Sequence, residues 1–161
     1  MKLLKCFTCD LAVRSGKPVT LSRVVRMLLL EPGNRAVAYY RIACWLRALR
    51  HPRRSTNFLA AMLLARLSRV PGVEIAVVSE IGEGLSLPHP HDIVLGHGAQ
   101  VGARVTIYNG VTLGARKLRA HDNVKDKLER YPIIEDEVTI FSGAKILGPV
   151  RIGARSTVGA N

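Results

Sequence analysis

Two groups of residues in this sequence have side chains that could carry out chemistry. The first is a histidine, His89, in the segment Leu87-Pro-His-Pro-His-Asp92, where a regular six-residue repeat is interrupted. An imidazole gains and loses a proton near neutral pH, so a histidine held at such a point is a candidate general base. The alternative is that His89, like His91 and His97, is an ordinary surface or turn residue.

The second group is the pair Cys6 and Cys9, which form a single CxxC motif. A zinc site would need two further ligands at matching spacing, and the sequence offers no second CxxC and no nearby histidine pair. A thioredoxin-like redox role would need a βαβ pattern around the motif, which is lacking. With Cys44 the chain has three cysteines, too few for a disulfide framework. We therefore expect neither a metal site nor a redox site.

The repeat around His89 predicts the fold. Apolar residues recur every six positions in three runs: Ile75, Ile81 and Leu87; Leu95, Val101, Ile107 and Leu113; Ile134, Ile140, Ile146, Ile152 and Val158. A helix repeats at 3.6 residues and a strand at 2, so neither alone explains a period of six. A triangular parallel β-helix does, because each face of a coil is then one hexapeptide with an inward residue. We expect a mainly β protein in which residues 73–161 form a left-handed parallel β-helix.

Two features disturb this repeat. The apolar positions shift by two residues between Leu87 and Leu95, around His89. The polar and highly charged segment Ala115 to Pro132 then leaves the repeat, and we expect an excursion at 115–132 that either gates a site or is a solvated flap. The repeat ends at Asn161 partway through a coil, so we expect the β-helix domain to be C-terminally incomplete.

Residues 1–72 are expected to form a basic helical segment. After a loosely ordered lead-in, the apolar spacing predicts helices from Thr20 or Ser22 to Leu30, from Arg35 to Arg50 and from Asn57 to Val70. Arg41, Arg47 and Arg50 supply charge to the second. Residues 1–76 hold 14 Lys and Arg against 3 Asp and Glu, whereas residues 77–161 hold 10 against 9.

This charge allows peripheral contact with an anionic membrane surface, or it belongs to a solvated face. No recognised motif supports nucleic-acid binding. The longest apolar run, Phe58 to Ala65, is far shorter than the ~18 residues of a membrane span, and Met1-Lys-Leu-Leu-Lys5 does not begin a signal peptide. We expect a cytoplasmic protein.

The repeat and the sequence motifs within it resemble those of the hexapeptide acyltransferases, most closely the serine acetyltransferase branch. The resemblance spans about Tyr39 to Asn161. The motifs that carry it are Arg41-Ile42-Ala43, Gly72-Val-Glu-Ile75, Leu87-Pro-His-Pro-His-Asp-Ile-Val94, Gly110-Val-Thr-Leu-Gly114, Arg130-Tyr-Pro132 and Gly143-Ala-Lys-Ile-Leu-Gly148.

The resemblance implies a homotrimeric enzyme that transfers acetyl from acetyl-CoA, bound between neighbouring subunits, to an acceptor hydroxyl. It places the general base on His89 and an orienting carboxylate on Glu74, where serine acetyltransferases carry Asp. The positions that it implies for acetyl-CoA are Gly114, Ala115, Ser142, Gly143, Lys145 and Gly159, although corner glycines and turn residues occur in every such coil.

Departures from the family pattern concern the acceptor. Pro88 stands where serine acetyltransferases carry Asp before the catalytic histidine, and Tyr131 stands where they carry a second histidine. Arg130 is retained and could pair with a carboxylate. Relatives with similar changes acetylate sugar hydroxyls, so Arg130 and Tyr131 are expected to bind either serine or a saccharide. The competing hypothesis is a non-catalytic β-helix scaffold or assembly subunit.

Overall fold

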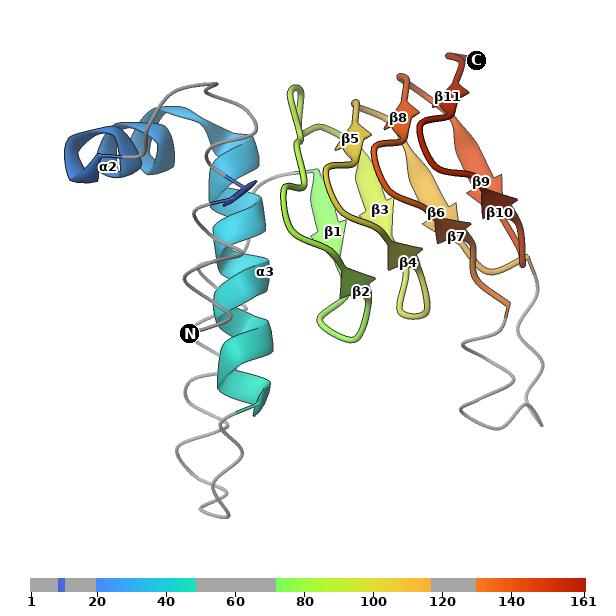
Figure 1. The fold of residues 1–161 in the computed structure, drawn as a ribbon, viewed down its shortest axis with the longest axis horizontal. Helices are drawn as coiled ribbons and strands as arrows, with labels where there is room; N and C mark the ends of the chain where they lie inside the picture. Colours follow the sequence, from blue (N-terminus) through green and yellow to red (C-terminus); the bar gives the residue numbers. More distant parts are fainter. Residues whose placement is uncertain (1–8, 11–19, 49–71, 117–129) are drawn as a thin grey trace.

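The computed structural model describes residues 9–10, 20–48, 72–116 and 130–161 of the chain (Figure 1). The expected helix from Asn57 to Val70, Cys6, and most of the lead-in and of the 115–132 excursion lie outside these residues. Two helices, α2 (Leu21–Leu30) and α3 (Pro32–Ala48), precede a stack of short strands. Within the described ranges, neither helix is long and apolar enough to cross a membrane.

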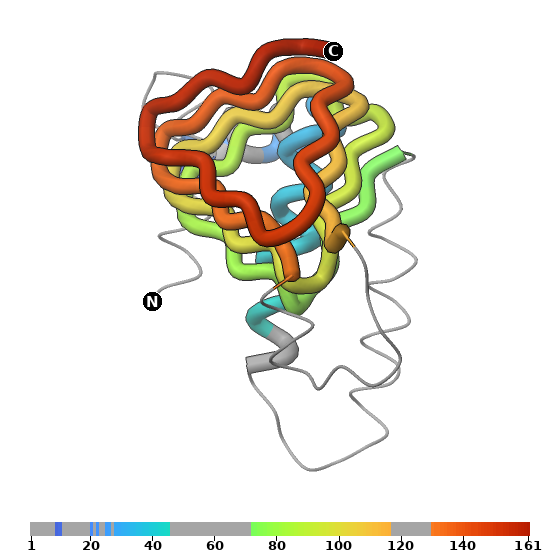
Figure 2. The backbone as a smooth tube through the Cα atoms, turned by 90° about the vertical axis from the view of Figure 1, so that its right-hand side faces the viewer, coloured from blue at the N-terminus to red at the C-terminus, as the bar shows by residue number. Residues whose placement is uncertain are grey.

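The strands form a left-handed parallel β-helix, which confirms the predicted fold. In chain order they are β1 (Val73–Ile75), β2 (Glu80–Ile81), β3 (Ile93–Leu95), β4 (Gln100–Val101), β5 (Thr106–Ile107), β6 (Thr112–Gly114), β7 (Ile133–Ile134), β8 (Thr139–Ile140), β9 (Lys145–Leu147), β10 (Arg151–Ile152) and β11 (Thr157–Val158). They pair in parallel into three sheets, β1-β3-β6-β9, β2-β4-β7-β10 and β5-β8-β11. Viewed along the axis, the coils lie one behind another, with the last coil in front (Figure 2).

The strand register locates both disturbances of the repeat. Val94 pairs with Thr112, three hexapeptides later, as expected for a regular coil. Val73 pairs with Ile93, which lies two positions beyond three hexapeptides, so the turn that contains His89 is longer than a regular one, and the predicted shift is confirmed. Thr112 pairs with Lys145, much further along the chain, so a longer insertion lies between β6 and β7. Both insertions leave the strand pairing intact.

The core consists of the predicted inward positions and a second set four residues later. Leu95, Ile107, Leu113 and Ile140 are completely buried, whereas Ile75 and Val158, at the two ends of the stack, are only partly buried. The second set is as well buried as the first in the middle of the stack: Ala99, Val105, Val111 and Val138. Small or β-branched residues recur there because the narrow corners of the triangular section leave little room.

Helix α3 begins earlier than the sequence predicted. We expected residues 31–34 to be a break and a helix to start at Arg35, but α3 starts at Pro32. Proline suits the first position of a helix, where its missing N–H would have no partner within the helix and its fixed φ is already helical. Glu31 supports this start, because its Oε2 accepts a hydrogen bond from Asn34 Nδ2 at 2.9 Å.

Helix α3 packs against the first coil, where no further coil covers the core. Its Ala36 and Val37 belong to the core cluster. The Tyr40 hydroxyl donates a 2.7 Å hydrogen bond to the carbonyl of Ser79, and burial raises the pKa of this phenol, so the hydroxyl keeps its proton. The described residues do not cover helix α2 uniformly, since Val25 is 49% exposed.

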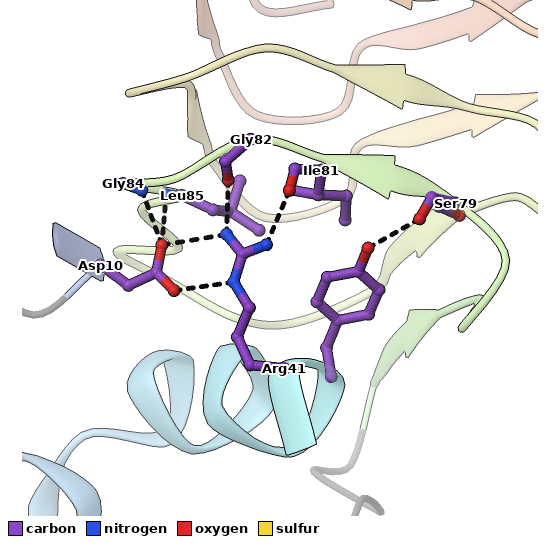
Figure 3. A network of polar contacts seen from close by, with 8 residues as sticks. Asp10, Arg41, Ser79, Ile81, Gly82, Gly84 and Leu85 are labelled. Atoms are coloured by element: carbon purple, nitrogen blue, oxygen red, sulfur yellow. Dashed lines mark hydrogen bonds and ion pairs between the residues drawn. The ribbon is translucent and has the colours of Figure 1, made fainter. Parts of the chain in front are cut away.

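The prediction that Arg41 contributes surface charge is wrong, because this side chain is buried between α3 and the first coil (Figure 3). Its Nε donates to Asp10 Oδ2 at 2.9 Å and its Nη2 to Asp10 Oδ1 at 3.1 Å. Arg41 also donates to the carbonyl of Ile81 at 2.6 Å and to that of Gly82. The Asp10 carboxylate in turn accepts hydrogen bonds from two amides of the same coil, those of Gly84 at 2.7 Å and Leu85 at 3.0 Å.

Replacing Arg41 with methionine should therefore strongly destabilise the protein. The substitution leaves Asp10 as a buried charge without its cation and leaves the carbonyls of the first coil without a donor. Breaking a buried pair in this way costs about 3–5 kcal/mol. Guanidinium denaturation followed by circular dichroism measures the change.

A matched control is Arg104→Met, which breaks an ion pair of the same type with Glu137 (2.6 Å) on the exposed side of the β-helix. Exposed pairs contribute little to stability. Equal losses for the two variants would contradict the role given to Arg41.

Gly102 and Gly153 occupy equivalent corners of two coils but differ in how closely other residues approach them. A Cβ at Gly102 would lie 2.7 Å from the backbone of Asp136 and Glu135 in the next coil, whereas a Cβ at Gly153, in the last coil, would meet only Ser156 Oγ at 3.8 Å. Gly102→Ala should lower the free energy of unfolding by about 1–3 kcal/mol through overpacking. Gly153→Ala should leave it nearly unchanged. Thermal unfolding of the two variants distinguishes them, and similar melting temperatures would contradict this packing.

Candidate active site

All residues assigned to a site from the sequence lie on one of the three faces of the β-helix or on its two edges. This face is the sheet β1-β3-β6-β9, here called the site sheet. The turns that lead into it form the entry corner (residues 88–92, 108–111, 141–144 and 159–161). The turns that leave it form the exit corner (residues 76–79, 96–99, 115–116, 130–132 and 148–150).

A column of outward-facing residues crosses the site sheet from the first coil to the last. The register aligns Glu74 with Val94, Val94 with Thr112, and Thr112 with Lys145. Glu74 and Lys145 are exposed at the two ends of this column, with three strand spacings, or roughly 14 Å, between them. The site sheet thus presents a carboxylate near its first edge and an ammonium group near its last.

His89 is exposed on the entry corner, in the two-residue insertion. The turn is held by backbone hydrogen bonds, from the His91 amide to the His89 carbonyl at 2.9 Å and from the Gly110 amide to the His91 carbonyl at 2.8 Å. The insertion therefore forms a defined turn that presents the imidazole to solvent on the edge of the site sheet.

Two aromatic residues that sequence reasoning missed continue from His89 along the entry corner. The His89 and Tyr108 rings have centroids 6.1 Å apart and planes inclined by 40°, and Tyr108 stacks on Phe141 at 5.2 Å and 13°. Tyr108 and Phe141 each follow an inward isoleucine of the repeat, Ile107 and Ile140, which pair in register. Aromatic residues at the same repeat position were the signal that could have revealed them.

The predicted pair Glu74 and His89 lies at the same end of the site sheet but is not joined by a hydrogen bond in the described structure. Glu74 is on β1, and the turn that holds His89 leads into β3, the neighbour of β1. Catalytic hydrogen bonds often form fully only when the substrate is bound.

The positions assigned to acetyl-CoA have different surroundings. On the entry corner, Ser142 donates a 2.8 Å hydrogen bond to Asn109 Oδ1, and the Asn161 side chain occupies the place that a Cβ at Gly143 would take. A Cβ at Gly159 would meet nothing within 4 Å, so this position is open.

On the site sheet, Lys145 Nζ donates to the Gly110 carbonyl and, at 3.1 Å, to Thr112 Oγ1. Gly114 lies at the end of β6, where a Cβ would come 3.0 Å from Leu147. Lys145 is thus an exposed cation on the site sheet, whereas the face of Gly143 is covered by the chain's own Asn161.

Three further predicted residues lie on the exit corner. Ala115 directly follows β6, and Arg130 and Tyr131 precede β7. The Tyr131 ring packs on Gly96 of the preceding coil, where a Cβ would come 2.9 Å from the Leu113 carbonyl and 3.2 Å from Tyr131 Cδ1. The width of the site sheet therefore separates the acceptor-binding candidates Arg130 and Tyr131 from His89. Within the described ranges, no group of three His, Cys, Asp or Glu side chains could hold a metal ion.

The chain is similar to known proteins over almost its whole length. It is 38% identical over 136 residues to the serine acetyltransferase of Helicobacter pylori. This alignment covers 84% of this chain and 72% of the Helicobacter pylori protein. It is 35% identical over 159 residues to the serine acetyltransferase of Mycobacterium tuberculosis. This alignment covers 99% of this chain and 64% of the Mycobacterium tuberculosis protein. No family model matches the sequence.

Solved structures agree with these relatives. The serine acetyltransferase of Neisseria gonorrhoeae superposes with a TM-score of 0.76 at 31% identity, over 99% of this chain and 56% of that one. The soybean serine acetyltransferase apoenzyme gives 0.75 at 33% identity, over 98% and 60%. The chain thus spans little more than half the length of these two enzymes. With this sequence similarity and this fold, the chain belongs to the serine acetyltransferase family of hexapeptide-repeat acyltransferases.

Proposed function

We propose that the protein transfers the acetyl group of acetyl-CoA to the hydroxyl of serine. The observation that carries this proposal is the similarity to serine acetyltransferases along almost the whole chain. Among the similar solved structures are a serine acetyltransferase in complex with CoA and that of Neisseria gonorrhoeae in complex with serine. The exposed ammonium group of Lys145 on β9 supports a site for the CoA anion on the site sheet.

His89 acts as the general base in this proposal. The acceptor hydroxyl is too weak an acid to attack a thioester unaided near neutral pH, and an imidazole within hydrogen-bond reach removes its proton as the oxygen attacks the carbonyl carbon. The new C–O bond forms and the C–S bond breaks. The imidazolium then returns its proton to the departing thiolate. Glu74 accepts the other ring N–H of His89 and fixes its tautomer.

Arg130 favours serine as the acceptor, because a guanidinium pairs well with an amino-acid carboxylate. Pro88 and Tyr131 favour the second candidate, a sugar hydroxyl of a surface polysaccharide, because they replace two polar residues of the serine enzymes with an apolar ring and a phenol. Similarity over the whole chain weighs more than two substitutions, so serine is our first candidate.

The two edges of the site sheet support a homotrimer as the working form. His89 is on the entry corner, and Arg130 and Tyr131 are on the exit corner of the same sheet. A site that uses all of them is completed when the entry corner of one copy faces the exit corner of the next, and cyclic symmetry repeats this contact without an open end. The expected cytoplasmic location and peripheral membrane contact stay predictions.

Replacing His89 with alanine should reduce turnover by about 10²–10⁴-fold, the usual loss when a general base is removed. The assay mixes the protein with acetyl-CoA, serine and a reagent that detects free thiol. The matched control is His91→Ala, two residues away on the same turn and also exposed. Full activity of the His89 variant, or equal losses in both variants, would remove His89 as the base.

The same assay decides between the acceptors. CoA release with serine supports the first candidate, and release with mono- and oligosaccharides but not with serine supports the second. If no acceptor releases CoA, the proposed transfer is wrong and the scaffold hypothesis replaces it.

Mixing two inactive variants should restore activity if each site is shared between copies. His89→Ala damages only the entry corner and Arg130→Ala only the exit corner. In an equal mixture of trimers, about one quarter of the interfaces combine an intact His89 with an intact Arg130. We expect activity to rise toward that fraction after unfolding and refolding the two variants together, with separately refolded variants as the control. A mixture no more active than its components would show that each chain holds a complete site.

A further inference from the structure

We propose that the stacked rings of Tyr108 and Phe141 position the imidazole of His89, with Tyr108 as the residue in direct contact. This inference rests on the proposed function, since it assigns a positioning role beside the proposed base. It concerns a row of three rings, one from each of three successive turns of the entry corner.

A positioning contact is needed because the turn that carries His89 departs from the regular coil. Two extra residues lie in it, and in the described structure the His89 imidazole makes no hydrogen bond to Glu74. An exposed histidine on such a turn has several rotamers available, and a base works only when its nitrogen is held toward the acceptor. The Tyr108 ring, inclined by 40° with its centroid 6.1 Å away, restricts the imidazole from one side.

Tyr108 itself is well placed to hold another ring. Its amide donates a 3.0 Å hydrogen bond to the Ile140 carbonyl, and its ring stacks on Phe141 at 5.2 Å and 13°. The next residues of the two turns are also joined, since Ser142 Oγ donates to Asn109 Oδ1 at 2.8 Å. The turn that holds Phe141 and the turn that holds Tyr108 therefore act as one support.

Phe141 supports Tyr108 from the next coil. Its side chain is 39% exposed, and burying it in the core would have stabilised the protein more. A large apolar ring kept on the surface, in register with Tyr108 and one coil beyond it, is explained if it limits the movement of the ring that contacts His89.

The test compares Tyr108→Leu, Tyr108→Phe and Phe141→Leu, with Val25→Ala, an exposed apolar residue on α2, as the control. We expect Tyr108→Leu to lower kcat on the order of tenfold with little change in KM for acetyl-CoA, because the ring that orients the base is lost. Tyr108→Phe keeps the ring and should restore kcat. Phe141→Leu should lower kcat less than Tyr108→Leu, and Val25→Ala should not lower it.

A second readout does not depend on activity. The ring protons of His89, assigned by comparison with His89→Gln, should change their NMR shift in Tyr108→Leu and remain nearly unchanged in Tyr108→Phe. A Tyr108→Leu variant with a lower melting temperature but normal kcat would show a purely structural stack and overturn the proposal. Unchanged His89 resonances in that variant would overturn it as well. If no acceptor is acetylated by the parent protein, the proposed function fails, and the NMR comparison still decides whether Tyr108 holds His89.

Discussion

The backbone hydrogen bonds between successive coils constrain everything else in this protein. Each strand of a middle coil pairs in parallel with the strand below it and the strand above it, so a residue can be inserted only where no pairing is lost. The regular spacing of three hexapeptides between Val94 and Thr112 reflects this rule. The longer spacings, from Val73 to Ile93 and from Thr112 to Lys145, keep it too, because the additions are confined to corners. Residues that serve chemistry are therefore expected at corners and on outward positions, and the site residues lie there.

The same constraint creates a problem at the first coil, whose lower edge has no coil to pair with. An open edge leaves backbone groups without partners, and covering such an edge with a helix is one known solution. Here helix α3 covers the edge, and two side chains also supply hydrogen-bond partners to its backbone groups. Arg41 supplies donors to two carbonyls, those of Ile81 and Gly82, and Asp10 supplies acceptors to two amides, those of Gly84 and Leu85. Because each side chain also neutralises the other, a buried ion pair becomes compatible with the apolar end of the core.

Sequence reasoning reached the fold because the six-residue period is a local pattern, visible in residues such as Leu95, Val101 and Ile107. It also placed the two-residue shift, since a change of phase is local too. It failed where the partners are distant in sequence. Arg41 looked like part of a charged helix surface, and only a contact with Asp10, 31 residues earlier, and with the first coil, 40 residues later, explains its burial. Tyr108 was missed for the same reason, because its neighbours His89 and Phe141 meet it only through the stacking of coils.

The stacking of the coils thus brings His89, Tyr108 and Phe141, which are distant in sequence, into a single column on the entry corner. In a regular coil the bridge between Ser86 and Thr106 would continue so that Pro88 lies level with Tyr108. With two residues added in this turn, His89 instead lies beside the Tyr108 ring. The pairing on both sides of the insertion is kept, and the His91 carbonyl still accepts a hydrogen bond from the Gly110 amide, so the aromatic stack adds a restraint through side chains to that of the backbone. A longer turn held at its base by the backbone presents an imidazole to solvent, and a ring held by the next two coils can limit where that imidazole points.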